Sequence, residues 1–545
     1  MPERSATSRA IDKLTDRADT LAGAWGARAR ASTTLGQERA MLRLYGVTGL
    51  DRAGRPLAGA AVDRWVASSR DGLAGGIALP FAMALVEYDL DPQQLALDVA
   101  SGAIDLALEA ELLRERDRRE LAVAEASRLV GAAVDRVDAD RVARRELLDL
   151  LGEAGRPWIG TTLSEPDVDG ALDEAAALAA AGYDLLRVEV PVGRELAARM
   201  EAAGVEVPQW RPGQTSRGGR RGSDIGDLDE TDPAPSGSQR ALARLRHTAD
   251  GVAAQRRGYV RLGTAIPPLG VPEGAVVAAF ERVDLVEADP VAEIVVGGVD
   301  PDRSLADHAF ARRLHRRADT FVSIGPGPLV VAPDLVSGIP SDPATRSGRA
   351  LALQLLGVAL ARADGLAAER LVVGAYPEWL AEEPSATARV LAEVALRRSL
   401  FPGQIIRFDE PAGSRDGRLS VAWPFVVAAA LHRVGRTALI MRRAHAGGVA
   451  AVDEARAAAR IAADIADVAD PGALHGVAEE HSTAMLAAAT ATLERLSDLG
   501  WRAVVGDPPR AAGRSTEGRT NRAIGGDAVA ERTESFDPLT AFDPD

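Results

Sequence analysis

The sequence predicts an α/β protein built on a (β/α)8 TIM-type barrel, with a helical N-terminal accessory layer and C-terminal helices. The first observation is that short apolar strands alternate with helices over roughly 300 residues, which favours a parallel barrel. The second is the segment 259–287, a strand, a Gly- and Pro-rich loop, a helix beginning at Pro272 and Glu273, and a second strand. The loop follows the carboxyl end of its strand, where barrels of this class bind ligands.

The remaining elements follow in chain order. The first 150 residues carry helical patterns and no alternation typical of a strand. Ser32, Thr33 and Thr34 are expected to cap the next helix. Residues 423–442 are expected to form an apolar helix. Barrel strands are expected at 157–163, 184–190, 259–262, 285–287, within 318–327 (a strand followed by a glycine turn), 369–376 and 404–408. One strand is therefore missed, or the barrel is irregular.

These patterns divide the chain into four parts. They are a helical accessory segment (1–150), a TIM-type barrel (151–450), C-terminal helices (451–505) and a polar tail (506–545). The tail is expected to be poorly ordered or docked on a partner. The pairs Arg312-Arg313 and Arg316-Arg317 are interpreted as solvated helix faces.

Composition excludes several functions. The net charge of −15 argues against a nucleic-acid partner, and the lack of a long apolar run argues against a membrane. The chain is expected to be cytoplasmic. It has no cysteine, which excludes thiolate metal sites, and no metal site is predicted. Its single lysine is Lys13, and arginine cannot form a Schiff base. If pyridoxal phosphate (PLP) is used, its lysine is expected from another chain.

Several motifs along the chain resemble one family. They are STTLGQERAMLRLYGVTGLD (32–51), RPGQTSRGG (211–219), the segment from Tyr259 to Asp289, and SLFPGQIIRF (399–408). Together they resemble the α subunit, or barrel subunit, of lysine 5,6-aminomutase. The chain resembles a divergent member of that family. The resemblance implies a barrel that holds an amino-acid substrate and PLP against adenosylcobalamin. It also implies a cobalamin-binding β-type subunit that carries the cobalamin and the PLP lysine.

The resemblance suggests an anion site in two segments. After the second barrel strand, the family's phosphate-binding run becomes 190–195 here, with Val190 and Glu195 in place of its Arg and Ser. Gly193 is retained, and Arg194 either restores a positive charge or is an exposed helix residue. In the second segment the candidates are Gly213, Thr215, Ser216, Arg217 and Gly218. Their amides, hydroxyls and guanidinium suit an anion, and the alternative is a flexible polar loop.

Four further residues are expected to contact substrate: Arg261, Thr264, Tyr376 and Glu378. The family's Asn-Tyr-Cys-Ser, which includes a PLP-contacting Tyr, becomes Thr264 to Pro267 here. Tyr376 and Glu378 face the barrel mouth or pack at its rim. No catalytic residue is identified.

Three functions remain open. The first is the α-type component of an adenosylcobalamin-dependent aminomutase, which moves an amino group between adjacent carbons of an amino acid by a radical mechanism. The second is a catalytically drifted barrel that binds or stabilises a cobalamin-domain partner without PLP chemistry. The third is an unrelated barrel enzyme that uses carboxylates as acid and base.

Overall fold

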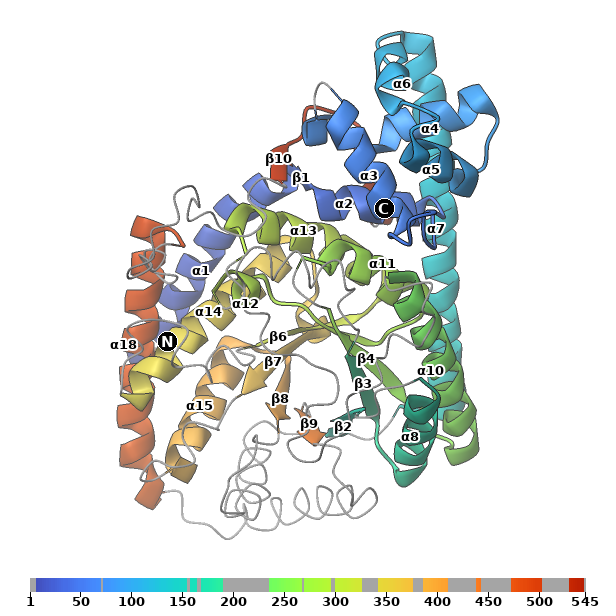
Figure 1. Ribbon diagram of the computed structural model, residues 1–545. Helices are drawn as coiled ribbons and strands as arrows, with labels where there is room; N and C mark the ends of the chain where they lie inside the picture. The colour runs from blue at the N-terminus through green and yellow to red at the C-terminus, as the bar shows by residue number, and fades with distance from the viewer. Residues whose placement is uncertain are drawn as a thin grey trace, which may run out of the picture.

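The computed structural model confirms a closed barrel of parallel strands (Figure 1). It describes residues 6–69, 72–153, 157–163, 168–189, 235–266, 269–295, 299–325, 342–375, 386–409, 438–442, 472–501 and 529–543. The barrel strands are β2 (Trp158–Thr162), β3 (Leu185–Glu189), β4 (Arg261–Ala265), β5 (Leu285–Glu287), β6 (Phe321–Ile324), β7 (Leu371–Ala375), β8 (Ile405–Asp409) and β9 (Ala438–Arg442). The last strand, β9, pairs with the first, β2, and so closes the barrel.

Strand β9 corrects the prediction of an apolar helix over 423–442. Its residues Ala-Leu-Ile-Met-Arg pair in parallel with β8 and β2. A short apolar run that is buried on both faces has no helical or strand period of its own, so periodicity does not distinguish the two. Residues 423–437 lie outside the described part of the chain.

Helices surround the barrel on its outer side. Those described are α8 (Val168–Ala181), α10 (Pro235–Arg256), α11 (Val271–Phe280), α12 (Pro290–Val295), α13 (Pro301–Ala318), α14 (Pro343–Ala363) and α15 (Ala386–Leu400). Helix α11 begins as predicted, with a proline in its first turn and Glu273 near its positive end. Asp-Pro pairs start α13 and α14: Asp300 and Asp342 each accept hydrogen bonds from first-turn amides.

The accessory layer contains α2 (Leu35–Leu44), α3 (Leu57–Ser68), η1 (Gly72–Gly75), α4 (Ala78–Tyr88), α5 (Pro92–Ser101), α6 (Leu106–Leu112) and α7 (Arg116–Leu151). The predicted cap of α2 is confirmed, because Thr34 accepts a hydrogen bond of 3.0 Å from the amide of Gln37. Contrary to expectation, Ser32–Thr34 also form a strand, β1, which pairs with β10 (Val529–Glu531) from the tail. The two strands lie near opposite ends of the sequence, so they pair only in the folded protein.

Two helices from opposite ends of the chain lie together on one side of the barrel. Helix α1 (Ala6–Arg30) and helix α18 (Gly472–Leu499) both pack on α14 (Figure 1). Trp25 of α1 and Trp501, just beyond α18, have ring centroids 4.7 Å apart. The N-terminal and C-terminal helices therefore form one outer layer.

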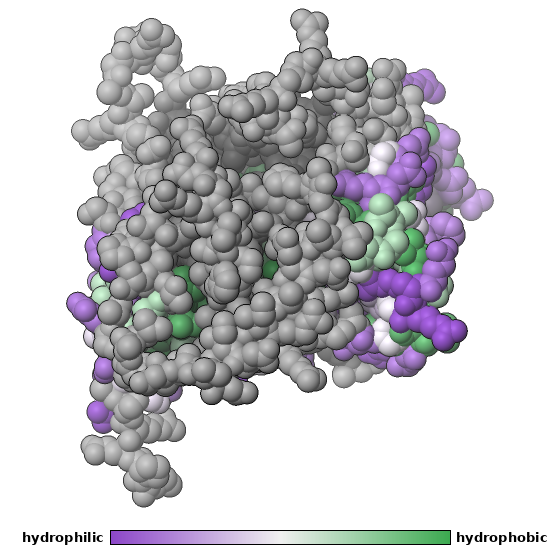
Figure 2. All heavy atoms as spheres, turned by 90° about the horizontal axis from the view of Figure 1, so that it is seen from below, coloured by the Kyte–Doolittle hydropathy of each residue, from purple (hydrophilic) through white to green (hydrophobic). Residues whose placement is uncertain are grey.

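The side opposite the accessory layer shows described residues mainly along one flank. There, hydrophilic residues lie beside hydrophobic ones (Figure 2). Within the described ranges, no helix is both long enough and apolar enough to cross a bilayer.

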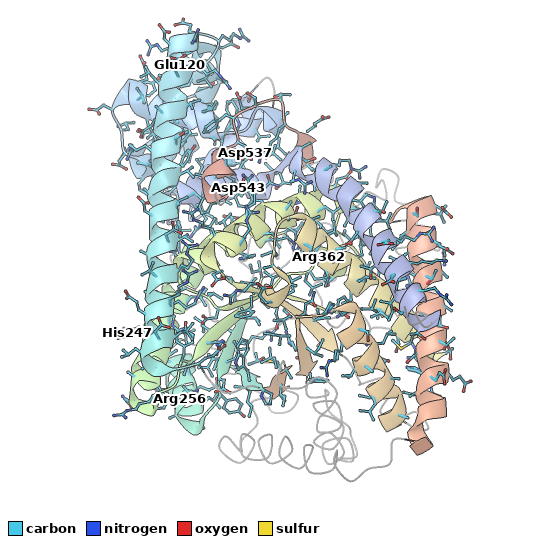
Figure 3. The ribbon with its side chains drawn as sticks, turned by 180° about the vertical axis from the view of Figure 1, so that it is seen from behind. Glu120, His247, Arg256, Arg362, Asp537 and Asp543 are labelled. Carbon is cyan, nitrogen blue, oxygen red and sulfur yellow. The ribbon has the colours of Figure 1, made fainter. Side chains whose placement is uncertain are left out.

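Helix α7 connects the accessory layer to the barrel. Its 36 residues span about 54 Å at 1.5 Å per residue. Seen from behind, Glu120 lies near one end of this helix, and His247 and Arg256 of α10 lie beside the other (Figure 3). Helix α4 of the accessory layer packs on α7, and the carbonyl of Gly152, directly after α7, accepts a hydrogen bond from the amide of Tyr259 near the start of β4.

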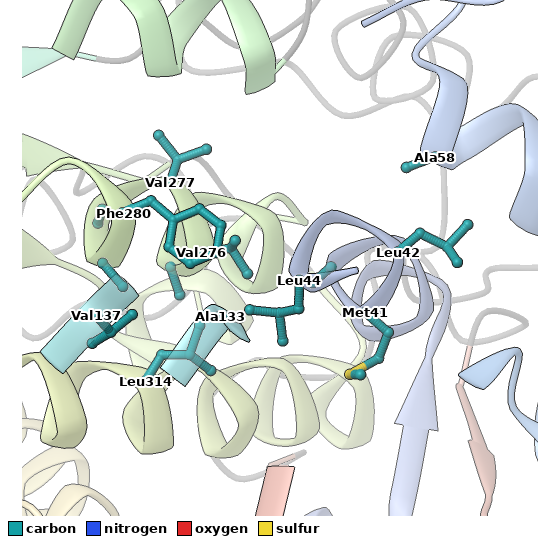
Figure 4. Close-up of a cluster of buried hydrophobic side chains, with 14 of the residues drawn as sticks. Met41, Leu42, Leu44, Ala58, Ala133, Val137, Val276, Val277, Phe280 and Leu314 are labelled. Atoms are coloured by element: carbon teal, nitrogen blue, oxygen red, sulfur yellow. The ribbon is translucent and has the colours of Figure 1, made fainter. Parts of the chain in front are cut away.

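The core between accessory layer and barrel is apolar. In Figure 4, Leu44 of α2 points toward Ala133 of α7 and Val276 of α11, Leu314 of α13 lies beside Ala133, and Met41 of α2 lies farther away. All five belong to one cluster of buried side chains. Burial of this kind contributes roughly 25 cal/mol for each Å² of apolar surface removed from water.

The interpretation of the arginines on α13 as solvated is wrong for Arg312 and incomplete for its neighbours. Arg312 is 2% exposed, and its Nη1 lies 2.8 Å from Oδ2 of Asp364. Arg317 pairs with Asp138 of α7 at 2.5 Å. Arg313 and Arg316 pair with carboxylates of the tail. Helix α13 is covered by other elements, so its charged residues serve as contacts between them.

The close packing of α14 on α18 gives a testable prediction. A Cβ on Gly348 would lie 2.4 Å from the backbone oxygen of Met485, whereas one on Gly131 of α7 would meet nothing within 4 Å. We expect Gly348→Ala to lower the free energy of unfolding by about 1–3 kcal/mol through overpacking. Gly131→Ala, the matched control, is expected to raise it by about 0.5–1 kcal/mol. Urea unfolding measures both, and equal effects would contradict the packing.

Candidate functional site

The inner half of the barrel near the amino ends of the strands is filled by apolar side chains. Alternate residues of each strand point inward. The inward apolar cluster is Trp158, Leu185, Leu285, Phe321, Val372, Ile405, Leu439 and Met441. Most of these are the first or second residues of their strands. These described residues fill the amino end of the barrel interior, and a site is expected at the carboxyl ends.

Toward the carboxyl ends, the interior becomes ionic. Four charged side chains from three strands form what we call the mouth cluster: Arg187 (β3), Glu287 (β5), Arg407 and Asp409 (β8). Nη2 of Arg187 lies 2.8 Å from Oε2 of Glu287, and Nη1 of Arg407 donates to Oε1 of the same carboxylate. Glu287 therefore bridges two arginines that come from opposite parts of the barrel.

Two hydroxyls extend the cluster. Nη1 of Arg187 lies 3.1 Å from Oγ1 of Thr162, and Nη1 of Arg407 lies 3.5 Å from Oγ of Ser323. Burial raises the pKa of Glu287, but the charges of Arg187 and Arg407 and their hydrogen bonds outweigh it and leave the pKa below its usual value. The carboxylate is ionised at neutral pH, and the four charges sum to zero.

Asp409 has one oxygen available. Nε and Nη2 of Arg407 both donate to Oδ1, at 2.9 and 2.6 Å. Oδ2 is buried and has no hydrogen-bond partner among the residues that the structure describes. A buried carboxylate oxygen without a partner is costly, so this atom is suited to receive a donor from a ligand or a water molecule.

A buried hydrogen-bond network lies behind the mouth cluster, at the carboxyl end of β7. Nε2 of Gln354 (α14) donates to the carbonyl of Gly374, the neighbour of Arg407 in strand register, at 2.8 Å. Nε of Arg397 donates to Oε1 of Gln354 at 3.2 Å, and Nη1 of Arg397 lies 2.8 Å from Glu393. The end of β7 is therefore fixed by side chains of α14 and α15.

Two predicted substrate contacts lie elsewhere. Arg261 is the first residue of β4, at the amino end of the barrel. Its guanidinium lies 3.7 Å from the ring centroid of Trp158 and 2.8 Å from Oε1 of Glu153. Thr264 alternates with Gly263, whose Cβ would meet the inward Leu185 and Leu285, so Thr264 faces outward. These positions do not favour a substrate contact for either residue.

The other predicted site residues lie outside the described ranges. They are Gly193, Arg194, Gly213, Thr215, Ser216, Arg217, Gly218, Tyr376 and Glu378. Tyr376 directly follows the last residue of β7. These nine assignments stay predictions.

The sequence contains a signal for the mouth cluster that the loop-based prediction missed. In Leu-Leu-Arg-Val-Glu (185–189) and Ile-Ile-Arg-Phe-Asp (405–409), charges occupy alternate positions of otherwise apolar strands. A parallel barrel strand is covered on its outer face by helices, so charges at its carboxyl end face the interior. This pattern indicates Arg187, Arg407 and Asp409 without a structure.

Comparison with known proteins gives a family. Residues 6–197 and 236–423 match the family model described as the D-lysine 5,6-aminomutase TIM-barrel domain of alpha subunit. The chain is 23% identical over 390 residues to the lysine 5,6-aminomutase alpha subunit of Fusobacterium nucleatum, covering 71% of this chain and 68% of that one. It is 24% identical over 388 residues to that of Acetoanaerobium sticklandii, covering 71% and 67%.

Among solved structures, dihydropteroate synthase from Anaplasma phagocytophilum superposes with a TM-score of 0.35. Its sequence is 12% identical, and the match covers 56% of this chain and 98% of that one. A likeness this weak has no bearing on function.

Proposed function

The chain belongs to the family of the D-lysine 5,6-aminomutase alpha-subunit TIM-barrel domain, and from this premise we propose that it is the barrel component of an adenosylcobalamin-dependent aminomutase. The reaction is the migration of an amino group between adjacent carbons of an amino acid by a radical mechanism. A β-type partner carries the cobalamin and the lysine that binds PLP. The substrate is lysine or a similar diamino acid.

The observation that carries this proposal is the mouth cluster. An amino-acid substrate presents carboxylate and ammonium groups, and the cluster offers charges of both signs at the carboxyl ends of the strands. The open Oδ2 of Asp409 suits an ammonium group. Arg187 and Arg407 suit carboxylate or phosphate oxygens. Glu287 holds both arginines in place by ion pairs.

The cluster also fits PLP in its donor set. Arginine pairs with a phosphate, and a carboxylate pairs with a protonated pyridine nitrogen. Arg187 or Arg407 would hold the phosphate. The cofactors supply the electron sink and the radical when bound. Lys13, the single lysine, is exposed on α1, outside the barrel. The chain's own residues therefore bind and orient the substrate and exclude water, while the reactive amine comes from the partner.

Reconstitution tests the proposal. The chain would be co-expressed with a cobalamin-domain protein encoded beside it and supplied with adenosylcobalamin, PLP and lysine. We expect an isomeric diamino acid, separable by chromatography. Asp409→Asn is expected to lower kcat/KM by about 10–100-fold, the loss of one charged hydrogen bond. Asp173→Asn, at an exposed position of α8, is the control and is expected to leave it unchanged.

A second candidate is favoured by one observation. Ala265 aligns with the family's PLP-contacting Tyr and pairs in register with Glu287, yet it carries neither a ring nor a hydroxyl. A barrel that binds a cobalamin-domain partner without PLP chemistry accounts for this. It predicts a stable complex with cobalamin bound, no PLP uptake and no isomer. Failure to form any complex would contradict both candidates.

A further inference from the structure

The C-terminal residues 529–543, which we call the strap, lie on the accessory layer and on α13. The strap contains β10 and the short helix η6 (Pro538–Phe542). We propose that the surface formed by β1, α7 and α13 is a peptide-acceptor site selective for an acidic segment, and that the strap is its ligand, held in cis and separable. This inference does not depend on the proposed aminomutase activity.

The first part of the site is a strand edge. β10 pairs antiparallel with β1, with Ser32 opposite Glu531 and Thr34 opposite Val529. The amide of Arg532 extends the pairing to the carbonyl of Ala31 at 2.9 Å. A strand edge binds a peptide through main-chain hydrogen bonds, which give affinity with little sequence selectivity.

Selectivity comes from arginines. Arg119 of α7 binds Glu534 through both terminal nitrogens. Arg313 of α13 binds Asp537 at 2.6 Å and Asp543 at 2.7 Å, and Arg316 also binds Asp543. Figure 3 labels Asp537 and Asp543 in the strap between α7 and the N-terminal helices. Paired guanidinium–carboxylate contacts discriminate strongly for acidic ligands.

An apolar socket completes the site. Asp537 caps η6 by accepting from the amide of Leu539 at 3.0 Å. This turn places Leu539 and Phe542 three residues apart on one face, where they are 2% and 0% exposed. Both belong to the core cluster that includes residues of α2, α7 and α13. The ligand pattern is therefore Glu534-x-x-Asp537-x-Leu539-x-x-Phe542-Asp543.

The two helices of the acceptor also contact each other directly, through residues outside the strap. Arg317 of α13 pairs with Asp138 of α7, and Nη1 of Arg144 donates to the carbonyl of Ala318 at 2.5 Å. Ala133, Val137 and Leu314 pack between the same two helices (Figure 4). The acceptor elements lie within the residues that match the family, 6–197 and 236–423, whereas the strap lies beyond them. Site and ligand are thus distinct segments of one chain.

The test uses the full chain with a specific protease site inserted between residues 510 and 520. After cleavage we expect the fragment that contains residues 529–543 to stay bound in size-exclusion chromatography at low salt. An excess of the synthetic peptide 529–543 should displace it. Arg313→Glu should weaken retention by at least about tenfold, since it replaces two ion pairs by repulsion, and high salt should weaken retention of the wild-type fragment.

Arg116→Glu is the matched control, because Arg116 is an exposed residue of α7 that pairs with Glu120. Circular dichroism verifies that both variants keep their helix content. The proposal would be overturned if the wild-type fragment dissociated immediately after cleavage, or if the synthetic peptide did not exchange with it. Equal retention by the Arg313 and Arg116 variants would overturn its selectivity for acidic ligands.

Discussion

Replacing Glu287 with alanine is expected to lower the free energy of unfolding by about 3–5 kcal/mol, because two largely buried arginines lose their shared counter-charge. The side chains of Arg187 and Arg407 are 15% and 9% exposed, and that of Glu287 is 19% exposed. Water therefore compensates only part of the lost charge. The same substitution is expected to abolish substrate binding, since both guanidinium groups lose the contact that orients them.

Urea unfolding at neutral pH measures the loss. Glu120→Ala is the control, because its pair with Arg116 is exposed, with side chains 63% and 87% accessible. Exposed pairs contribute less than about 1 kcal/mol. The difference between wild type and Glu287→Ala should shrink as the pH falls below 4.5, the usual pKa of the group, because the folded pKa is lowered. Similar losses for both variants would show that the mouth cluster is not buried.

Most of the barrel could be predicted because most of its strands are short apolar runs that can be recognised locally in the sequence. Strand β3, for example, is a short and mostly apolar run that begins directly after Asp184. Strand β9 was missed because its apolar residues continue a longer apolar stretch. The pairing of β1 with β10 joins residues almost 500 positions apart in the sequence. No local pattern indicates such a pair, since each strand has only three residues.

The sequence prediction placed the candidate site at the carboxyl ends of the strands but named loop residues rather than the strand residues of the mouth cluster. The sequence places a strand over 259–262 and a loop from Gly263, so Thr264 is expected at the mouth and Arg261 near it. The strand instead runs from Arg261 to Ala265. It starts two residues later and ends three residues later than expected, which leaves Thr264 within the strand, on its outer face, and puts Arg261 at the amino end. Strand boundaries decide which side chains face a ligand, and they depend on pairing with neighbours.

A second buried carboxylate, that of Glu293, has a raised pKa, whereas the pKa of Glu287 is lowered. Glu293 of α12 accepts a hydrogen bond of 2.9 Å from Ser304 and lies 3.4 Å from Nε2 of His308. Burial raises its pKa to about 8, and the Ser304 hydrogen bond and the charge of Arg303 offset this only in part. Burial also lowers the pKa of His308 well below its usual value, so the imidazole is neutral and supplies no counter-charge. Unlike Glu287, Glu293 is therefore protonated at neutral pH.

The wild-type protein is expected to lose stability as the pH rises, because of Glu293. The Glu293→Gln variant is expected not to show this loss. Between the usual pKa of 4.5 and the folded pKa of about 8, the unfolded chain releases a proton that the folded protein retains. Unfolding is therefore favoured progressively across this window, by on the order of 3 kcal/mol. Glutamine stays neutral, so the variant should gain this amount relative to wild type between pH 5 and pH 8 (about three units) in urea unfolding. Glu369→Gln, on the exposed surface, is the control and should run parallel to wild type. A Glu293→Gln curve parallel to wild type would show that this carboxyl is ionised in the folded protein, and that the space between α12 and α13 admits water.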